Sequence, residues 1–191
     1  MHRRSVVEIT KPEVEPVSLS MAKGQLGLLP EQQDDDELIL RLISAGRSLV
    51  EKRLGVSLAA RRFRATFIPD GTCRLRLPAP PLFVDGTHPL EVSVGGVTVS
   101  STTYVVDADS QPAEIRFTTM PAATVNDGLV VTFWGGPPPG DRIEPGLESA
   151  ILLFVAHWYR NREAVLTGTI SEVLPAGVET LLAAHSVTGA W

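Results

Sequence analysis

The chain has 191 residues, of which 43% are apolar and 20% are charged, a balance typical of an ordinary globular domain and not of an intrinsically disordered chain. There are 17 Lys and Arg against 22 Asp and Glu, so the formal net charge of −5 argues against an overall electrostatic grip on nucleic acid or an anionic membrane. The single cysteine, Cys73, excludes an internal disulfide framework. The most apolar stretch, 150–159, is far shorter than the roughly 20 residues that span a bilayer, so we expect a soluble protein without membrane contact.

Residues 1–17 are expected to form an irregular or extended lead, because Pro12 and Pro16 exclude a regular helix there. Ser18 is a favourable N-cap residue, and apolar residues recur at helical spacing after it. The pattern therefore predicts a short helix over 18–26.

A long amphipathic helix is predicted over 34–54. Its apolar positions follow 4-3-4 spacing, whereas Glu51 falls on the polar side. Asp34 is expected to cap the helix, with Glu37 completing a variant of the capping box. The acidic run has two interpretations, a metal site or negative charge that stabilises the positive end of the helix dipole, and we favour the second. The run consists of Asp34, Asp35 and Asp36.

The pattern changes between 57 and 136, where alternating apolar and polar residues replace the helical period. Gly95-Gly96 separates two such runs, which predicts a β-hairpin. Further strands are predicted at 62–67, 74–77, 103–106, 114–118 and 129–134. We therefore expect a small, mostly antiparallel β module inserted between helices, and an α+β fold class.

A third helix is predicted over 145–163, with Pro145 in its first turn. The three helices are expected to form a small bundle, so that 18–163 makes one domain. A C-terminal arm over 164–191 follows, and either packs on the chain's own core or docks into a groove of a partner. Its apolar contact residues are Val178, Leu181, Leu182 and Trp191.

Arginine alternates with apolar residues on two predicted strands. Arg62 and Arg64 lie on one strand, and Arg74 and Arg76 on the other. If these strands pair, the four guanidinium groups share one sheet face. That face then contacts phosphate or the acidic surface of a partner, or it is a solvated face balanced by nearby carboxylates.

The sequence carries no recognisable catalytic, cofactor-binding or metal-binding motif. No Gly-rich segment is followed by Gly-Lys-Ser/Thr, and none opens a helix as a dinucleotide fingerprint does. None of the four histidines has a second His or Cys at metal-ligand spacing. We therefore expect no enzyme activity and no cofactor.

The order of the elements, together with two motifs near the C-terminus, resembles a known family. One motif is His-Trp-Tyr-Arg-Asn-Arg-Glu at 157–163, and the other is Pro-Ala-Gly-Val-Glu-Thr-Leu-Leu at 175–182. Over about 17–183 the chain resembles the head–tail connector (adaptor) family of long-tailed phages, prophages and gene transfer agents. It departs from that pattern after the Leu-Leu pair, where Ala183-Ala184-His185 replaces an aromatic–Arg pair.

The resemblance implies a structural, non-enzymatic role in the neck of a virion or gene transfer agent particle assembled in the bacterial cytoplasm. Family members form a ring, typically twelvefold, beneath the portal protein. The ring extends the channel through which DNA passes without sequence-specific binding, and it gives the stopper or tail a docking platform. The arm is then the portal-docking segment, and the arginines of the β module and the acidic run are the expected subunit contacts.

Two alternatives from other functional classes stay open at this stage. A small-ligand or carbohydrate-binding β module predicts a lasting monomer with a concave apolar pocket. An enzyme predicts a His or Cys with a perturbed pKa in a cleft.

Overall fold

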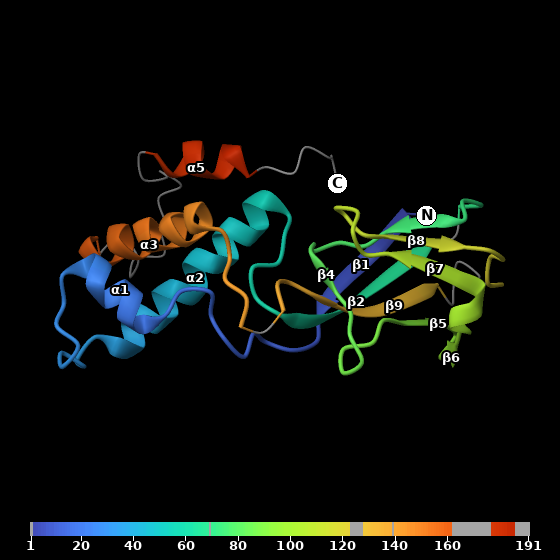
Figure 1. Cartoon of the computed structure of the whole chain (residues 1–191), viewed down its shortest axis with the longest axis horizontal. Coiled ribbons are helices and arrows are strands. Elements are labelled where there is room, and N and C mark those ends of the chain that lie inside the picture. Colours follow the sequence, from blue (N-terminus) through green and yellow to red (C-terminus); the bar gives the residue numbers. More distant parts are fainter. Residues whose placement is uncertain (1, 69, 123–127, 139, 162–176, 186–191) are drawn as a thin grey trace. The chain divides into compact units, whose positions relative to one another are not determined.

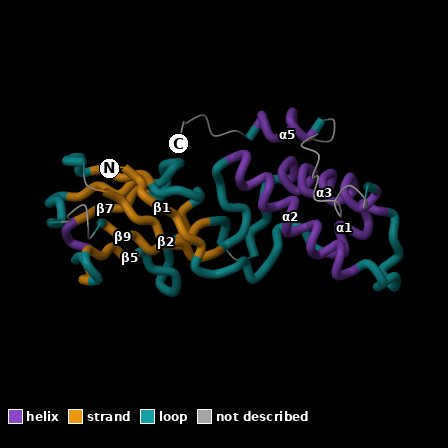
Figure 2. Tube along the Cα trace, turned by 180° about the vertical axis from the view of Figure 1, so that it is seen from behind, coloured by secondary structure: helices purple, strands orange, loops and turns teal. Residues whose placement is uncertain are grey.

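The structure, a computed structural model, describes residues 2–68, 70–122, 128–138, 140–161 and 177–185. The chain divides into two compact units, each built from two separate stretches of sequence. The β unit comprises Met1–Val14 and Gly55–Asp141, and the helical unit comprises Glu15–Leu54 and Arg142–Trp191. Figure 2 shows that the strands gather in one unit and the helices in the other, which confirms the α+β class.

The helical unit is built on two long helices that pack along their apolar faces. Its helices are α1 (Leu19–Leu26), α2 (Asp36–Leu54), α3 (Pro145–Arg160) and α5 (Val178–Ala184). Ile43 of α2 and Ile151 of α3 are fully buried, as the apolar spacing requires. Gly46 of α2 lies at this contact, where a Cβ would be 3.4 Å from the Ile151 side chain.

α1 begins directly after its predicted N-cap residue, whereas α2 begins later than predicted. The Ser18 hydroxyl accepts a hydrogen bond from the Met21 amide at 3.2 Å, as expected of an N-cap. The long helix begins at Asp36, so the expectation that Asp34 caps it is wrong. The Ile39 amide donates instead to the Asp35 carbonyl, which places the start of the helix later along the acidic run.

The β unit consists of two antiparallel sheets. Strands follow the order β1-β2-β9-β5-β6 in the larger sheet, where β4 also pairs with β9, and the order β3-β8-β7 in the smaller one. The larger sheet contains β1 (His2–Glu8), β2 (Arg61–Ile68), β4 (Leu82–Phe83), β5 (Glu91–Val94), β6 (Val97–Thr98) and β9 (Leu129–Gly135). The smaller sheet contains β3 (Arg74–Arg76), β7 (Tyr104–Asp107) and β8 (Glu114–Phe117), and a 3₁₀ turn, η1, covers Ser101–Thr103.

Both sheets contribute to one apolar core. Phe63 and Phe133 stack with their ring centroids 5.7 Å apart, and both are buried. Leu75 and Ile115 of the smaller sheet belong to the same cluster. Inward-facing residues on β2 alternate with outward-facing ones, so Arg62 and Arg64 of this strand face away from the core.

The N-terminal residues form an extended strand that belongs to the β unit. β1 pairs with β2 in antiparallel register, with Val6 opposite Ala65 and Val7 opposite Arg64. The first residues of the chain are therefore a strand of the β unit (Figure 1). The two prolines that exclude a helix lie after this strand, not within it.

Candidate functional site

The outer face of the larger sheet carries the first pair of predicted arginines. Arg62 and Arg64 point away from the core on β2, between the buried residues Phe63 and Ala65. Arg62 Nη2 lies 3.1 Å from Glu91 Oε2, so this guanidinium is paired within the sheet. Arg64 is exposed and has no ion-pair partner among the described residues. Arg64 is therefore the side chain of this pair that is available to another molecule.

The second pair of arginines lies in the other sheet, which corrects the expectation of a single four-arginine face. β2 pairs with β1 and β9, whereas β3 pairs with β8. Arg76 is bound to Glu114 at 3.1 Å, and Arg74 has no ion-pair partner among the described residues. The alternation along each strand correctly predicted that these side chains face outward, but not which strands are neighbours.

Arg116 was missed by the sequence analysis although its strand was predicted. It lies opposite Arg74 across the β3–β8 pair, and its guanidinium is 3.1 Å from Asp107 of β7. Alternation between the buried residues Ile115 and Phe117 is the signal that could have found it. The exposed face of the smaller sheet therefore combines three arginines with two carboxylates, most of them paired.

Two of the three aspartates in the acidic run at the start of α2 bind other residues of the helical unit. Asp36 lies 2.6 Å from the Lys23 ammonium of α1, and Asp35 accepts a hydrogen bond from the Tyr159 hydroxyl of α3. Asp34 is exposed, and no interaction of its side chain with described residues is present. Among the three predicted acidic contact residues, Asp34 is thus the one left for a partner. No group of three or more His, Cys, Asp or Glu in the described part of the chain could hold a metal ion.

The described part of the C-terminal arm is α5, which packs on α3 and α2. Val178 and Leu182 are buried at 0% and 6% exposure, and Leu181 is half-buried. Trp191 lies outside the described residues. In the isolated chain, α5 therefore covers its own apolar residues by folding back on the helical unit, the first of the two interpretations of this segment. Docking to a portal stays a prediction.

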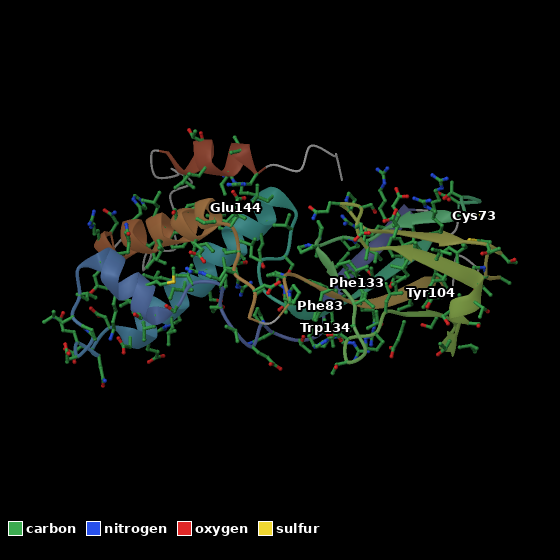
Figure 3. The ribbon with its side chains drawn as sticks, in the orientation of Figure 1. Cys73, Phe83, Tyr104, Phe133, Trp134 and Glu144 are labelled. Atoms are coloured by element: carbon green, nitrogen blue, oxygen red, sulfur yellow. The ribbon has the colours of Figure 1, made fainter. Side chains whose placement is uncertain are left out.

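An aromatic group that the sequence analysis did not find lies beside the first arginine pair. The ring of His88 contacts those of Phe83 and Trp134, with centroids 4.6 and 4.7 Å away. Phe83 and Trp134 are labelled in Figure 3. Asp85 Oδ1 accepts from the His88 ring at 2.8 Å and from the amides of Thr87 and His88. Desolvation raises the pKa of Asp85, but these hydrogen bonds outweigh it and leave the pKa below its ordinary value. These contacts connect the loop between β4 and β5 to Trp134 of β9.

No described helix combines the length and the apolar character required to cross a bilayer. Cys73 is exposed at the end of a loop before β3 (Figure 3).

Comparison with known proteins finds the same fold in particle necks. No protein-family profile matches the sequence, and no curated protein matches it. A chain from the neck of an empty GTA particle, computed with C6 symmetry, aligns with a TM-score of 0.78 and 18% identity, covering 98% of this chain and 97% of that one. A chain from the virion of a native gene transfer agent (GTA) particle aligns at 0.76 and 18%, covering 97% of both chains.

A chain from the neck of a native GTA particle, computed with C12 symmetry, aligns at 0.74 and 16% identity, covering 98% of this chain and 97% of that one. At this identity, the similarity establishes a shared fold. The resemblance found in the sequence is thus confirmed at the level of the fold, and it extends over nearly the whole length of the chains compared.

Proposed function

We propose that this chain, which has the fold of the neck chains of gene transfer agent particles, is a structural head–tail connector (adaptor). The observation that carries the proposal is coverage of 97–98% of both chains, because a shared module alone would match only part of each. In this role, copies of the chain form a ring under the portal protein, extend the DNA channel and present a platform to the stopper or tail. The protein works in the neck of a virion or gene transfer agent particle assembled in the bacterial cytoplasm, with no enzyme activity.

The charge distribution supports a channel through which DNA slides. The net charge is −5, and carboxylates about 3 Å away partly neutralise Arg62, Arg76 and Arg116. A guanidinium that is already paired contributes less to phosphate binding and to the release of counterions from DNA. We therefore expect weak, salt-sensitive DNA binding and no sequence preference.

The proposal is tested by mixing the protein with the portal encoded near it and imaging the product by electron microscopy. A ring added to one end of the portal supports the connector role. A chain that lacks residues 172–191 should lose this attachment, because it lacks the docking arm. Since Val178 is fully buried, circular dichroism must first show that the shortened chain stays folded. A folded full-length chain that adds no ring to an intact portal contradicts the proposal.

Ring formation requires two different surfaces on each copy, because side-to-side contacts in a closed ring are heterologous. We propose that Arg64 supplies one surface and Asp34 the other, since both are exposed and neither has a described ion-pair partner. The Arg64→Glu and Asp34→Lys variants should each reduce ring assembly on the portal by about tenfold or more, because like charges then face each other.

The double variant Arg64→Glu/Asp34→Lys should restore assembly, because it exchanges the charges across the contact. Arg41→Glu is a matched control for Arg64→Glu, since it changes the net charge by the same amount and Arg41 lies in an exposed pair with Glu37. Particle counts from electron micrographs give the measurement. Assembly that survives each single reversal would exclude this pairing while leaving the connector role intact.

A further inference from the structure

A histidine holds the C-terminal end of α5 against the helix that it packs on. His185 follows the last residue of α5, and its Nδ1 lies 2.7 Å from Oε2 of Glu144. Glu144 stands immediately before α3 (Figure 3), so the contact joins the end of one helix to the beginning of another. The His185 side chain is only 18% exposed, whereas that of Glu144 is 59% exposed. The imidazole is therefore seated on the protein, and the carboxylate reaches it from the solvent side.

The seat of the imidazole depends on a glycine in the first turn of α3. A Cβ placed on Gly146 would lie 2.6 Å from His185 Nε2, and 3.5 and 3.6 Å from two ring carbons. Real Cβ atoms do not approach a ring nitrogen so closely, so His185 occupies space that exists only because residue 146 has no side chain. Glycine is among the weakest helix formers, and Gly24 in α1 shows that a helical glycine here need not have such a neighbour. The absence of a side chain at 146 is thus matched to the ring of His185.

Apart from His185, few side chains hold α5 against the other helices. α5 has seven residues, and only Val178 and Leu182 are buried. A helix this short is not stable alone in water, because too few backbone hydrogen bonds follow the costly first turn. Formation of α5 and its packing on α3 are consequently one event, and removing any contact shifts the balance toward the open form. Val178 is the first residue of α5, and His185 follows the last one. The two residues therefore hold opposite ends of this short helix against the helical unit.

We propose that His185 is a latch that keeps α5 seated on its own helical unit, so that the docking arm is held back until a partner opens it. This inference rests on the proposed function, since it assumes that α5 belongs to the segment that binds the portal. In the latched form, the apolar side chains of Val178 and Leu182 are covered by α3 and α2. Opening the latch exposes these two side chains together, one helical turn apart on one face of α5. Binding of the arm through this face therefore competes with the latch.

The geometry is tested by hydrogen exchange of residues 178–184 in the full-length chain. Gly146→Ala should increase their exchange about tenfold by displacing the ring, although alanine favours helix formation at that position. His185→Ala should have a similar effect by removing the ring and its bond to Glu144. The double variant Gly146→Ala/His185→Ala should exchange no faster than His185→Ala alone, because the added Cβ no longer meets the ring of His185. Gly24→Ala is the matched control, with open space around its Cβ and no expected change in α5.

Unchanged exchange in Gly146→Ala, or additive effects in the double variant, would overturn the latch. The autoinhibitory part is tested with the same variants and an assembled portal ring, using biolayer interferometry. His185→Ala should bind the portal about tenfold more tightly than the natural chain, because binding no longer has to release α5 from α3. Tighter binding distinguishes a latch from a merely structural histidine, whose loss would weaken binding or leave it unchanged.

Each binding outcome separates this inference from the proposed function. If the natural chain binds the portal and His185→Ala binds no better, the connector role stands and autoinhibition is overturned. If only the open variant binds, both are supported. If neither binds while both remain folded, both the connector role and autoinhibition are overturned.

Discussion

Replacing Arg47 with methionine is expected to lower the free energy of unfolding by about 3–5 kcal/mol, because it removes the buried guanidinium that binds both Glu51 and Glu15. Arg47 Nη1 lies 2.7 Å from Glu51 Oε2, and both side chains are only 6% exposed. Arg47 Nε lies 2.7 Å from Glu15 Oε2, so the same guanidinium ties α2 to the segment before α1. Burial lowers the pKa of Arg47, but the hydrogen bonds and charges of Glu15 and Glu51 outweigh it and raise the pKa above its ordinary value.

Urea unfolding at pH 7 measures the loss in Arg47→Met. A loss below about 1 kcal/mol would show that the buried pair contributes no more than an exposed one.

Two controls isolate the buried pair. The double variant Arg47→Met/Glu51→Leu should recover much of the stability, because it replaces both charges by apolar groups. Arg41→Met removes one partner of a similar i,i+4 pair in the same helix, where the side chains are 70% and 87% exposed. It should change the free energy of unfolding by less than about 1 kcal/mol.

The Gly136→Ala substitution is expected to destabilise the chain by about 2–6 kcal/mol. Gly136 follows β9 with φ +105°, a conformation in which a side chain costs about 1–3 kcal/mol. In addition, a Cβ there would meet the backbone of Ala59, 2.6 Å from its carbonyl carbon, and would lie 2.9 Å from the Ala60 amide nitrogen. Backbone atoms cannot rotate away as a flexible side chain does, so the overpacking adds about 1–3 kcal/mol.

Gly140→Ala separates the two contributions. Gly140 has a similar φ of +95°, but a Cβ on it would meet nothing within 4 Å. It should therefore show only the conformational cost, about 1–2 kcal/mol. Thermal unfolding followed by circular dichroism compares the two variants. Equal losses would mean that the close approach to Ala59 is relieved by movement of the chain.

The elements whose structure depends on residues close together in the sequence were predicted well. The Gly95-Gly96 hairpin is present as β5 and β6, since its turn requires positive φ at both glycines and they supply it. The apolar spacing of α2 correctly identified the side that packs. It placed Glu51 on the polar side, however, where the structure buries it beside Arg47. Helical period alone does not reveal that a charged residue has found a partner in the interior.

Features that depend on distant residues were not accessible in this way. β1 pairs with a strand about sixty positions later, and its adjacent residues Val6 and Val7 weaken the alternation that marks a strand. The outward direction of Arg74 follows from its own strand, but its sheet is decided by β8. The seat of His185 depends on Gly146, which is separated from it by most of two helices. Such contacts are tertiary, and a single sequence carries no local signal for them.

The division of both units into two separate stretches of sequence has a consequence for biosynthesis. The larger sheet lacks its central strand until β9 leaves the ribosome, on the order of seconds after β2. The apolar face of α2 waits longer still, because α3 begins about ninety positions after α2 ends. During that interval, a nascent chain exposes the apolar face of α2 and the unpaired edge of β2. Such exposed apolar surfaces and strand edges are the features that chaperones bind. A fragment beginning at Gly55 would likewise lack β1, so neither unit is encoded as one continuous piece of the gene.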